Sequence, residues 1–217
     1  LIFFFFFKQK GSFYYREEDD VLRVNVKPVA LDYIVYWLKY DFIEHKETSC
    51  VIAMQWEKLS VPFKVEVDVD NIVLARIREQ SIGVKGFVSA NWIQASMYCF
   101  DKNINMEEAL GWAQRAVTGL PFGQSGYSAY NNLATGYEKM NRLSQADSVM
   151  NEGLTIASIN QYLSYNKALI AQKRSDRAIN IMLRAKTKFG DVYAVNNGLS
   201  YAYSGIADYA KALEYAK

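Results

Sequence analysis

The chain has a single histidine, the side chain most often used for proton transfer or metal binding near neutral pH. His45 lies in the polar segment EHKETS, between Glu44 and Glu47. A catalytic histidine needs a nucleophile or an orienting carboxylate beside it, and a metal site needs further nitrogen, sulfur or oxygen ligands. Neighbours within one short polar turn are usually solvated, so we assign His45 no catalytic or metal-binding role.

Acidic residues cluster at Glu17–Asp20, where a hard cation such as calcium could in principle bind. The run lacks the alternating ligand positions and the glycine of a known calcium loop, so a solvated turn between strands is the better interpretation. Glu57, Glu66 and Asp68 have the spacing of solvated strand faces, and no two carboxylates pair as a general acid and base. The sequence therefore predicts no catalytic residue and no metal site.

Two glycine-containing stretches, GLPFGQSG at 119–126 and GYSAYNNLATGYEK at 126–139, could suggest a phosphate-binding loop. Neither follows a strand and opens a helix in the required pattern, so no cofactor is predicted. Cys50 and Cys99 stand among apolar residues in segments that we expect to belong to different domains. We interpret both as buried free thiols, because thiols pack as small apolar groups.

The composition is that of a globular chain. The 217 residues are 51% hydrophobic and 22% charged, with a formal net charge of +2. Nucleic-acid binding is not expected, because the lysines and arginines are scattered among carboxylates and form no basic stripe. The apolar run Leu1–Phe7 is too short to span a bilayer and has no basic segment before it, so we predict no transmembrane segment and identify no signal peptide.

Residues 1–69 have the pattern of β-strands. Apolar and polar residues alternate over 21–27, two further runs cover 33–42 and 50–56 with a polar turn between them, and a fourth run covers 61–67. Short polar connections favour an antiparallel meander, so we predict a partial antiparallel sheet, as in part of a sandwich. The strongly apolar opening would be hazardous as an exposed strand, which indicates that upstream strands are missing and that the chain is a fragment.

A connecting helix and linker are predicted over residues 70–86. Asp70 or Asn71 is the expected N-cap, and two glycines near the end of the segment break the helix.

From residue 87 to residue 217 the chain repeats itself as paired helices. Ala146, Ala178 and Ala210 recur at a spacing of 32 residues, close to the tetratricopeptide period. A small side chain at this position lets the second helix of each pair approach the first closely.

Each of these alanines has a small and a large residue at fixed distances upstream, on the first helix of its pair. The small residues are Ala134, Asn166 and Gly198, and the large ones are Tyr137, Leu169 and Tyr201. Asn166 departs from the small-residue pattern. An earlier copy has Ala109 and Phe100 in these roles, with an enlarged loop at 119–126 after it. We therefore predict an α+β fold in two parts, whose second part is a curved solenoid of about 3.5 tetratricopeptide-like units.

The segments GSFYYREEDDVLRVNVKP (11–28), WEKLSVPFKVEVD (56–68) and PFG (121–123) resemble the bacterial family called domain of unknown function 2911, in its members with a helical-repeat tail. The resemblance covers nearly the whole chain and implies further strands before Leu1. It also implies an exported protein of the Bacteroidetes group, in the periplasm or cell envelope. The family has no established activity, so the resemblance transfers no functional residues.

The concave surface of the first helices is the remaining candidate site, because solenoids commonly hold extended peptides there. The residues expected on its exposed side are Gln94, Asn131, Glu138 and Lys167. The best-supported function is a non-enzymatic scaffold that binds a protein or peptide. An enzyme or small-ligand binder with its site in missing upstream strands stays open as the alternative, and a carbohydrate-binding face on the aromatic β-segment is a third possibility.

Overall fold

The computed structural model describes residues 2–6, 20–118 and 126–216, with side chains placed from Leu22 onward except that of Arg23. The chain divides into two compact units, residues 1–78 and 79–217. The first unit contains the described strands, and the second contains paired helices, so the predicted α+β fold in two parts is confirmed. None of the helices in the described ranges is long and apolar enough to cross a membrane.

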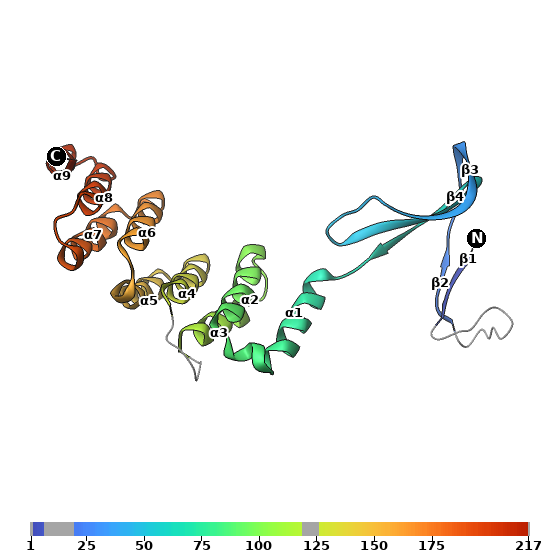
Figure 1. The fold of residues 1–217 in the computed structure, drawn as a ribbon, viewed down its shortest axis with the longest axis horizontal. Helices are drawn as coiled ribbons and strands as arrows, with labels where there is room; N and C mark the ends of the chain where they lie inside the picture. The colour runs from blue at the N-terminus through green and yellow to red at the C-terminus, as the bar shows by residue number, and fades with distance from the viewer. Residues whose placement is uncertain (1, 7–19, 119–125, 217) are drawn as a thin grey trace. The chain divides into compact units, whose positions relative to one another are not determined.

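The strands form two separate antiparallel pairs (Figure 1). β1 (Ile2–Phe6) pairs with β2 (Asp20–Asn25), and β3 (Val29–Ile43) pairs with β4 (Ser49–Glu66). The predicted antiparallel pairing is confirmed. Within the described residues β2 and β3 do not pair, so the continuous meander predicted from the sequence is wrong.

β3 and β4 form one long hairpin, which we call the ribbon. Tyr40 lies opposite Met54, and Phe42 lies opposite Ile52. The sequence predicts two runs in place of β4, with a break after residue 56, and the chain does reverse within β4: the backbone N–H of Val67, which follows β4, donates to the carbonyl of Thr48, which precedes it, at 2.9 Å. Glu57 lies halfway between Thr48 and Val67 and has a positive φ of 51°, at a point where the register with β3 is irregular.

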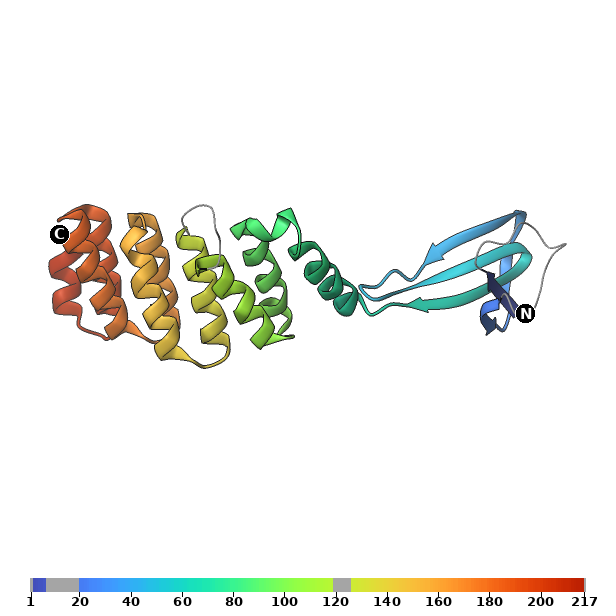
Figure 2. The ribbon, with the colours of Figure 1, turned by 90° about the horizontal axis from the view of Figure 1, so that it is seen from below.

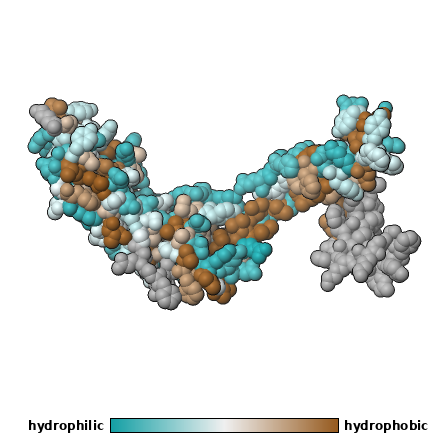
Figure 3. Space-filling model, viewed as in Figure 1, coloured by the Kyte–Doolittle hydropathy of each residue, from teal (hydrophilic) through white to brown (hydrophobic). Residues whose placement is uncertain are grey.

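The ribbon leaves many large apolar side chains in contact with solvent. Trp37 is 86% exposed and Tyr36 is 80% exposed, whereas Ala53 and Val61 are buried. Figure 3 shows apolar surface over β4 in the space-filling view. A ribbon of so few strands has two open faces, because neighbouring strands cover only the edges of one another.

α1 (Val69–Ser81) follows the ribbon directly. The Asp68 carboxylate accepts hydrogen bonds from the backbone N–H of Asn71 at 3.0 Å and from the side-chain amide of Asn71 at 2.6 Å. Asp68 is therefore the N-cap, and the prediction of Asp70 or Asn71 is wrong by two or three residues. The reason is physical: a capping carboxylate must precede the helix and reach the N–H of its third residue.

The second unit packs its helices in successive pairs, which Figure 2 shows side by side. After the short helix η3 (Val84–Phe87) come α2 (Ser89–Lys102), α3 (Met106–Thr118), α4 (Tyr127–Lys139), α5 (Leu143–Ile156), α6 (Ile159–Ala171), α7 (Ser175–Phe189), α8 (Tyr193–Ser204) and α9 (Tyr209–Ala216). The pairs are α2 with α3, α4 with α5, α6 with α7, and α8 with α9. The enlarged loop predicted at 119–126 lies, apart from Gly126, outside the described residues.

The fourth residue of the second helix in each pair is a buried alanine. These residues are Ala109, Ala146, Ala178 and Ala212. The backbone N–H of each donates a hydrogen bond to the carbonyl four residues earlier, so all four occupy the same place in the first helical turn. The packing role predicted for Ala109, Ala146 and Ala178 is confirmed.

Ala210 is exposed, so the third alanine of the predicted series is wrong and Ala212 takes its place. α6 starts 32 residues after α4, but α8 starts 34 residues after α6. The two extra residues are one in α7, which has 15 residues against 14 in α5, and one in the link that follows it. The large residue shifts as well: Tyr203 is buried, whereas Tyr201 is exposed.

The structure explains why Asn166 departs from the small-residue pattern. It is 1% exposed, and its side-chain amide donates to the backbone carbonyl of Gly198 in α8 at 3.0 Å. Asn132 in α4 likewise donates to the hydroxyl of Ser96 in α2 at 2.7 Å. Hydrogen bonds of buried amides thus join the first helices of neighbouring pairs, because a buried amide is stable only with a partner.

Candidate functional site

A cavity of about 550 Å³ opens between α2, α4 and α6, the first helices of three successive pairs. We call it the groove. Its walls come from the exposed faces of these helices, while the opposite faces pack against the second helices. This is the surface on which the sequence predicts a binding site.

The α2 wall of the groove is apolar except for Asp101 in the last turn of the helix. Ile93, Met97 and Phe100 line it, and their spacing of four and three residues puts them on one face of the helix. Met97 is 47% exposed, whereas Phe100 is buried against α4. A β-carbon at Gly136 would lie 2.3 Å from the Phe100 ring, so the glycine admits this ring between the two helices.

The α4 and α6 walls carry neutral polar groups. These belong to Ser128, Asn131, Thr135, Gln161 and Ser164. The Gln161 side chain accepts a hydrogen bond from the backbone N–H of Ser158 at 2.8 Å in the capping box of α6, so it is already engaged. Among the described residues, no hydrogen-bond partner faces the side-chain amide of Asn131, which is exposed and can both donate and accept at a ligand.

Two tyrosines complete the groove. Burial raises the pKa of Tyr127 to about 12, with smaller contributions from Tyr165 and Tyr162. Burial also raises the pKa of Tyr165, and the nearby Arg177 guanidinium opposes this rise. The Tyr165 hydroxyl makes no hydrogen bond of good geometry with the described residues. Both phenols are therefore neutral at physiological pH, which suits them to contact and hydrogen bonding and not to base catalysis.

Of the described residues that line the groove, only Asp101 carries a charge at neutral pH. Its side chain is 74% exposed, and its Oδ1 lies 4.0 Å from the Nζ of Lys139. Lys139 also donates to the backbone carbonyl of Phe100 at 2.5 Å. The lysine is thus held mainly at the end of α2, and one face of the carboxylate is open to solvent.

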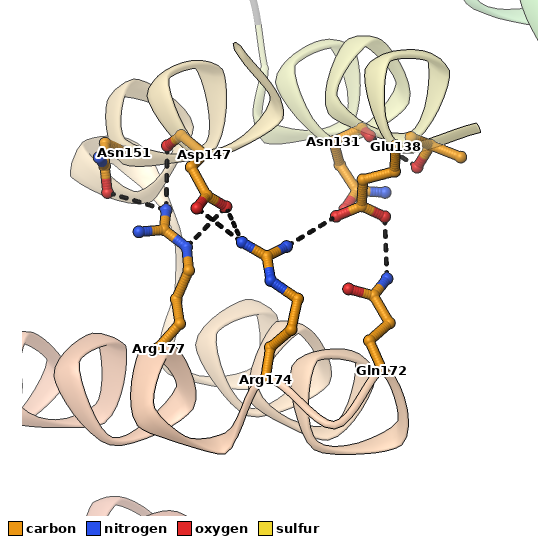
Figure 4. Close-up of polar contacts among 8 residues, drawn as sticks. Asn131, Glu138, Asp147, Asn151, Gln172, Arg174 and Arg177 are labelled. Carbon is orange, nitrogen blue, oxygen red and sulfur yellow. Dashed lines mark hydrogen bonds and ion pairs between the residues drawn. The ribbon is translucent and has the colours of Figure 1, made fainter. Parts of the chain in front are cut away.

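A polar seam joins the second helical pair to the third (Figure 4). Arg174, just before α7, donates two hydrogen bonds to the Asp147 carboxylate of α5, at 2.5 and 2.6 Å. The Nε of Arg177 lies 2.7 Å from the same carboxylate. These side chains are 18%, 22% and 25% exposed for Arg174, Arg177 and Asp147, so the pairing is partly shielded from water.

Glu138 also belongs to the seam. Its carboxylate accepts a hydrogen bond from the Gln172 side chain at 2.9 Å and lies 3.8 Å from Arg174 (Figure 4). The seam therefore sets the position of α4 relative to α6, the two helices that carry the polar walls of the groove. Because Tyr165 lines the groove and lies near Arg177, the seam and the groove adjoin.

The four residues predicted for the groove lie in three different environments. Asn131 lines it. Glu138 is engaged in the seam. Gln94 and Lys167 are exposed on α2 and α6 but do not line the cavity. The prediction placed all four on the first helices without fixing which way each helix faces.

Among the lining residues that were not predicted from the sequence are Met97, Asp101, Tyr127 and Tyr165. A usable pattern was present, since the groove-lining residues of each first helix recur at three- or four-residue spacing. Starting from Asn131 and stepping four residues along α4 leads directly to Tyr127 and Thr135. The same step on α2 leads from Met97 to Asp101.

The other residues considered for chemistry lie apart. His45 is exposed in the turn after β3. Cys50 is partly buried in β4, Cys99 is fully buried in α2, and neither forms a disulfide. Glu17 to Asp19 lie outside the described residues, within which no three potential ligands among the histidine, cysteine, aspartate and glutamate side chains gather to hold a metal ion.

Residues 1–65 match the family described as "Protein of unknown function (DUF2911)". No curated protein matches the chain. The matched segment covers the strands and ends before α1, so it does not include the groove. The family match therefore assigns no role to the groove residues.

Proposed function

We propose that this chain is a non-enzymatic scaffold whose helical pairs form a tetratricopeptide-like solenoid that binds an extended peptide in the groove. The observation that carries the proposal is the make-up of the groove: a wall on α2 that is apolar except for Asp101 lines the same cavity as neutral hydrogen-bonding groups on α4 and α6. An extended peptide needs both, because its backbone must keep hydrogen bonds while its side chains lose contact with water.

Asn131 and Met97 are the two lining residues most suited to this role. Asn131 stands on α4 with an exposed amide that matches the donor and acceptor of a peptide bond. Met97 stands on α2 with a flexible thioether that adapts to different apolar side chains. The lining offers contact surface and hydrogen bonds, and its phenols have pKa values too high for a base at neutral pH.

The direct test is selection of a displayed library of random peptides on the full chain, followed by affinity measurements with the enriched peptides. Asn131→Ala and Met97→Ala should each weaken binding by about tenfold, as expected for central contact residues. Gln94→Ala is the matched control, since Gln94 is exposed on α2 outside the groove. Unchanged affinity in both lining variants would exclude the groove as the binding site.

The ribbon supports a second candidate function, carbohydrate binding. Tyr36 and Trp56 flank a hollow of about 360 Å³ that also includes Glu57 and Lys58. Exposed aromatic rings can stack on the apolar faces of sugars, and the charged groups can bind hydroxyls. Retention of the chain on immobilised polysaccharide, and its loss in Trp56→Ala, would support this function; equal elution of both proteins would oppose it.

We further propose a periplasmic or envelope location and a Bacteroidetes-type origin, on the resemblance of residues 11–28 and 56–68 alone. Fractionation of cells that express the natural gene tests the location. Recovery of the protein only with cytoplasmic markers would contradict it.

A further inference from the structure

We infer that the groove selects peptides in which a basic side chain stands two positions from a large apolar one. This inference rests on the proposed function and adds the chemistry of the partner. Its basis is the juxtaposition of Met97 and Asp101 on the groove face of α2, in a lining with no described basic residue.

The spacing on α2 fits an extended peptide. Met97 and Asp101 are one helical turn apart, about 6 Å along the axis. Side chains two positions apart in an extended chain point the same way and are separated by about 7 Å. A peptide that places an apolar side chain on Met97 therefore brings the next side chain on that face to the Asp101 carboxylate.

The electrostatics of this end of the groove favour a cation. Asp101 lies in the last turn of α2, where the unpaired carbonyls of the helix add a partial negative charge. The Asp101 carboxylate is 74% exposed and can accept a second cation beside Lys139. Lys139 itself donates to the Phe100 carbonyl at the same helix end, so the structure already holds one ammonium group there.

The same lining disfavours an acidic peptide or a free terminal carboxylate. Lys167, the basic residue predicted for the groove, does not line it. Tyr127 and Tyr165 can donate hydrogen bonds to an anion but carry no positive charge. A carboxylate entering the groove would lose hydration and meet Asp101 without a described basic partner in the lining.

The test begins with the displayed random-peptide library on the full chain and on its Asp101→Asn variant. The wild-type chain should enrich lysine or arginine two positions from leucine, methionine or an aromatic residue, and the variant should lose this preference. One enriched peptide, capped at both ends, is then compared with copies carrying glutamine or glutamate in place of the basic residue.

Asp101→Asn should weaken binding of the basic peptide about two- to fivefold, the range of an exposed ion pair, and leave the glutamine peptide unchanged. Asp101→Lys should favour the glutamate peptide. Lys139→Met should strengthen binding of the basic peptide, because it removes the cation that competes for Asp101. Asp176→Asn, on the exposed side of α7, is the matched control and should have no effect.

Two failures are distinguishable. If the peptides bind equally whatever their charge, and Asn131→Ala weakens them all, the groove binds peptides but the charge preference is wrong. If no peptide is enriched, or if Asn131→Ala and Met97→Ala change nothing, both the preference and the proposed function are wrong.

Discussion

The ribbon and the helical pairs differ in how far their aromatic residues are exposed to solvent. Trp37 and Tyr36 in β3 are almost fully exposed, whereas Trp92 in α2 and Tyr162 in α6 are buried. Trp92 also donates its indole N–H to the Gly86 carbonyl at 2.8 Å, and Tyr162 donates its hydroxyl to the Leu154 carbonyl at 2.9 Å. Both regions contain tryptophan and tyrosine, but the helices pack against neighbouring helices whereas the faces of the ribbon are open.

This difference changes what an exposed apolar residue means. The strands of the ribbon alone cannot cover both of its faces, so the exposure of Trp37 follows from the topology and identifies no particular ligand. Paired helices bury alanines at matching positions, and the exposed large apolar residues on the first helices are Met97, Tyr193 and Tyr201. Of these three, only Met97 lines the groove, which is why the functional proposal rests on the helices.

The largest contrast is expected between two tryptophans. Trp92→Ala should lower the free energy of unfolding by about 3–5 kcal/mol, because it empties a buried site and leaves the Gly86 carbonyl without its donor. Trp37→Ala should change it by less than about 0.5 kcal/mol, because that ring is exposed. Chemical denaturation followed by circular dichroism measures both. Similar losses in the two variants would contradict the comparison.

Removing an ion pair should likewise cost more stability in the helical pairs than in the ribbon. Asp147→Ala leaves two partly buried guanidinium groups without their carboxylate and should cost about 2–4 kcal/mol, less than a fully buried pair because water reaches the seam. Its counterpart in the ribbon is Asp41, which pairs with Lys39 at 2.9 Å, where the side chains of Asp41 and Lys39 are 41% and 51% exposed. Asp41→Ala should leave the unfolding midpoint unchanged, and a loss as large as that of Asp147→Ala would refute the distinction.

Enlarging the packed alanine of the last helical pair should have a smaller effect on stability. Ala212→Leu should destabilise the helical unit by about 1–3 kcal/mol, since a larger side chain would separate α8 and α9. Ala210→Leu, two residues away and exposed, should be nearly neutral. Thermal unfolding of the two variants decides between the observed register and the spacing of 32 predicted from the sequence, which requires the reverse order.

The smallest effect should be a gain in stability. Asn141, Lys173 and Ala207 have φ values of 58°, 60° and 59° at the same place, the turn between the two helices of a pair. Alanine is strained in this conformation and glycine is not, so Ala207→Gly should raise the unfolding free energy by about 0.5–1 kcal/mol. Ala202→Gly in the interior of α8 is the control and should lower it by about 1 kcal/mol or more. A loss in Ala207→Gly would show that the turn differs from the one described.

Much of the fold follows from local patterns in the sequence. Alternation located β2 and the hairpin, and the alanine spacing located three of the four helical pairs. The break expected after residue 56 agrees with the reversal of the chain within β4, where Glu57 has a positive φ. Ala210 was predicted in place of Ala212 because a spacing measured over two repeats was extended to a third. The chain has one extra residue in α7 and one in the link after it.

The groove was predicted only in outline. Asn131 was found because it stands on an expected concave face, but Glu138 on the same helix turns to Arg174 and Gln172. Whether a carboxylate faces solvent or a distant arginine depends on contacts between residues 36 positions apart, which local periodicity does not report. Asp101 was missed for the same reason, because its importance comes from the neutrality of the residues around it in space.

The most direct test of the central proposal uses the methionine methyl groups as reporters in both regions. The chain has six methionines, with Met97 in the groove and Met54 in the ribbon. We expect addition of a library-selected peptide to shift the methyl resonance of Met97 in the NMR spectrum of the full chain and to leave that of Met54 unchanged. A shift at Met54 with no change at Met97 would place peptide binding on the ribbon and contradict the proposal.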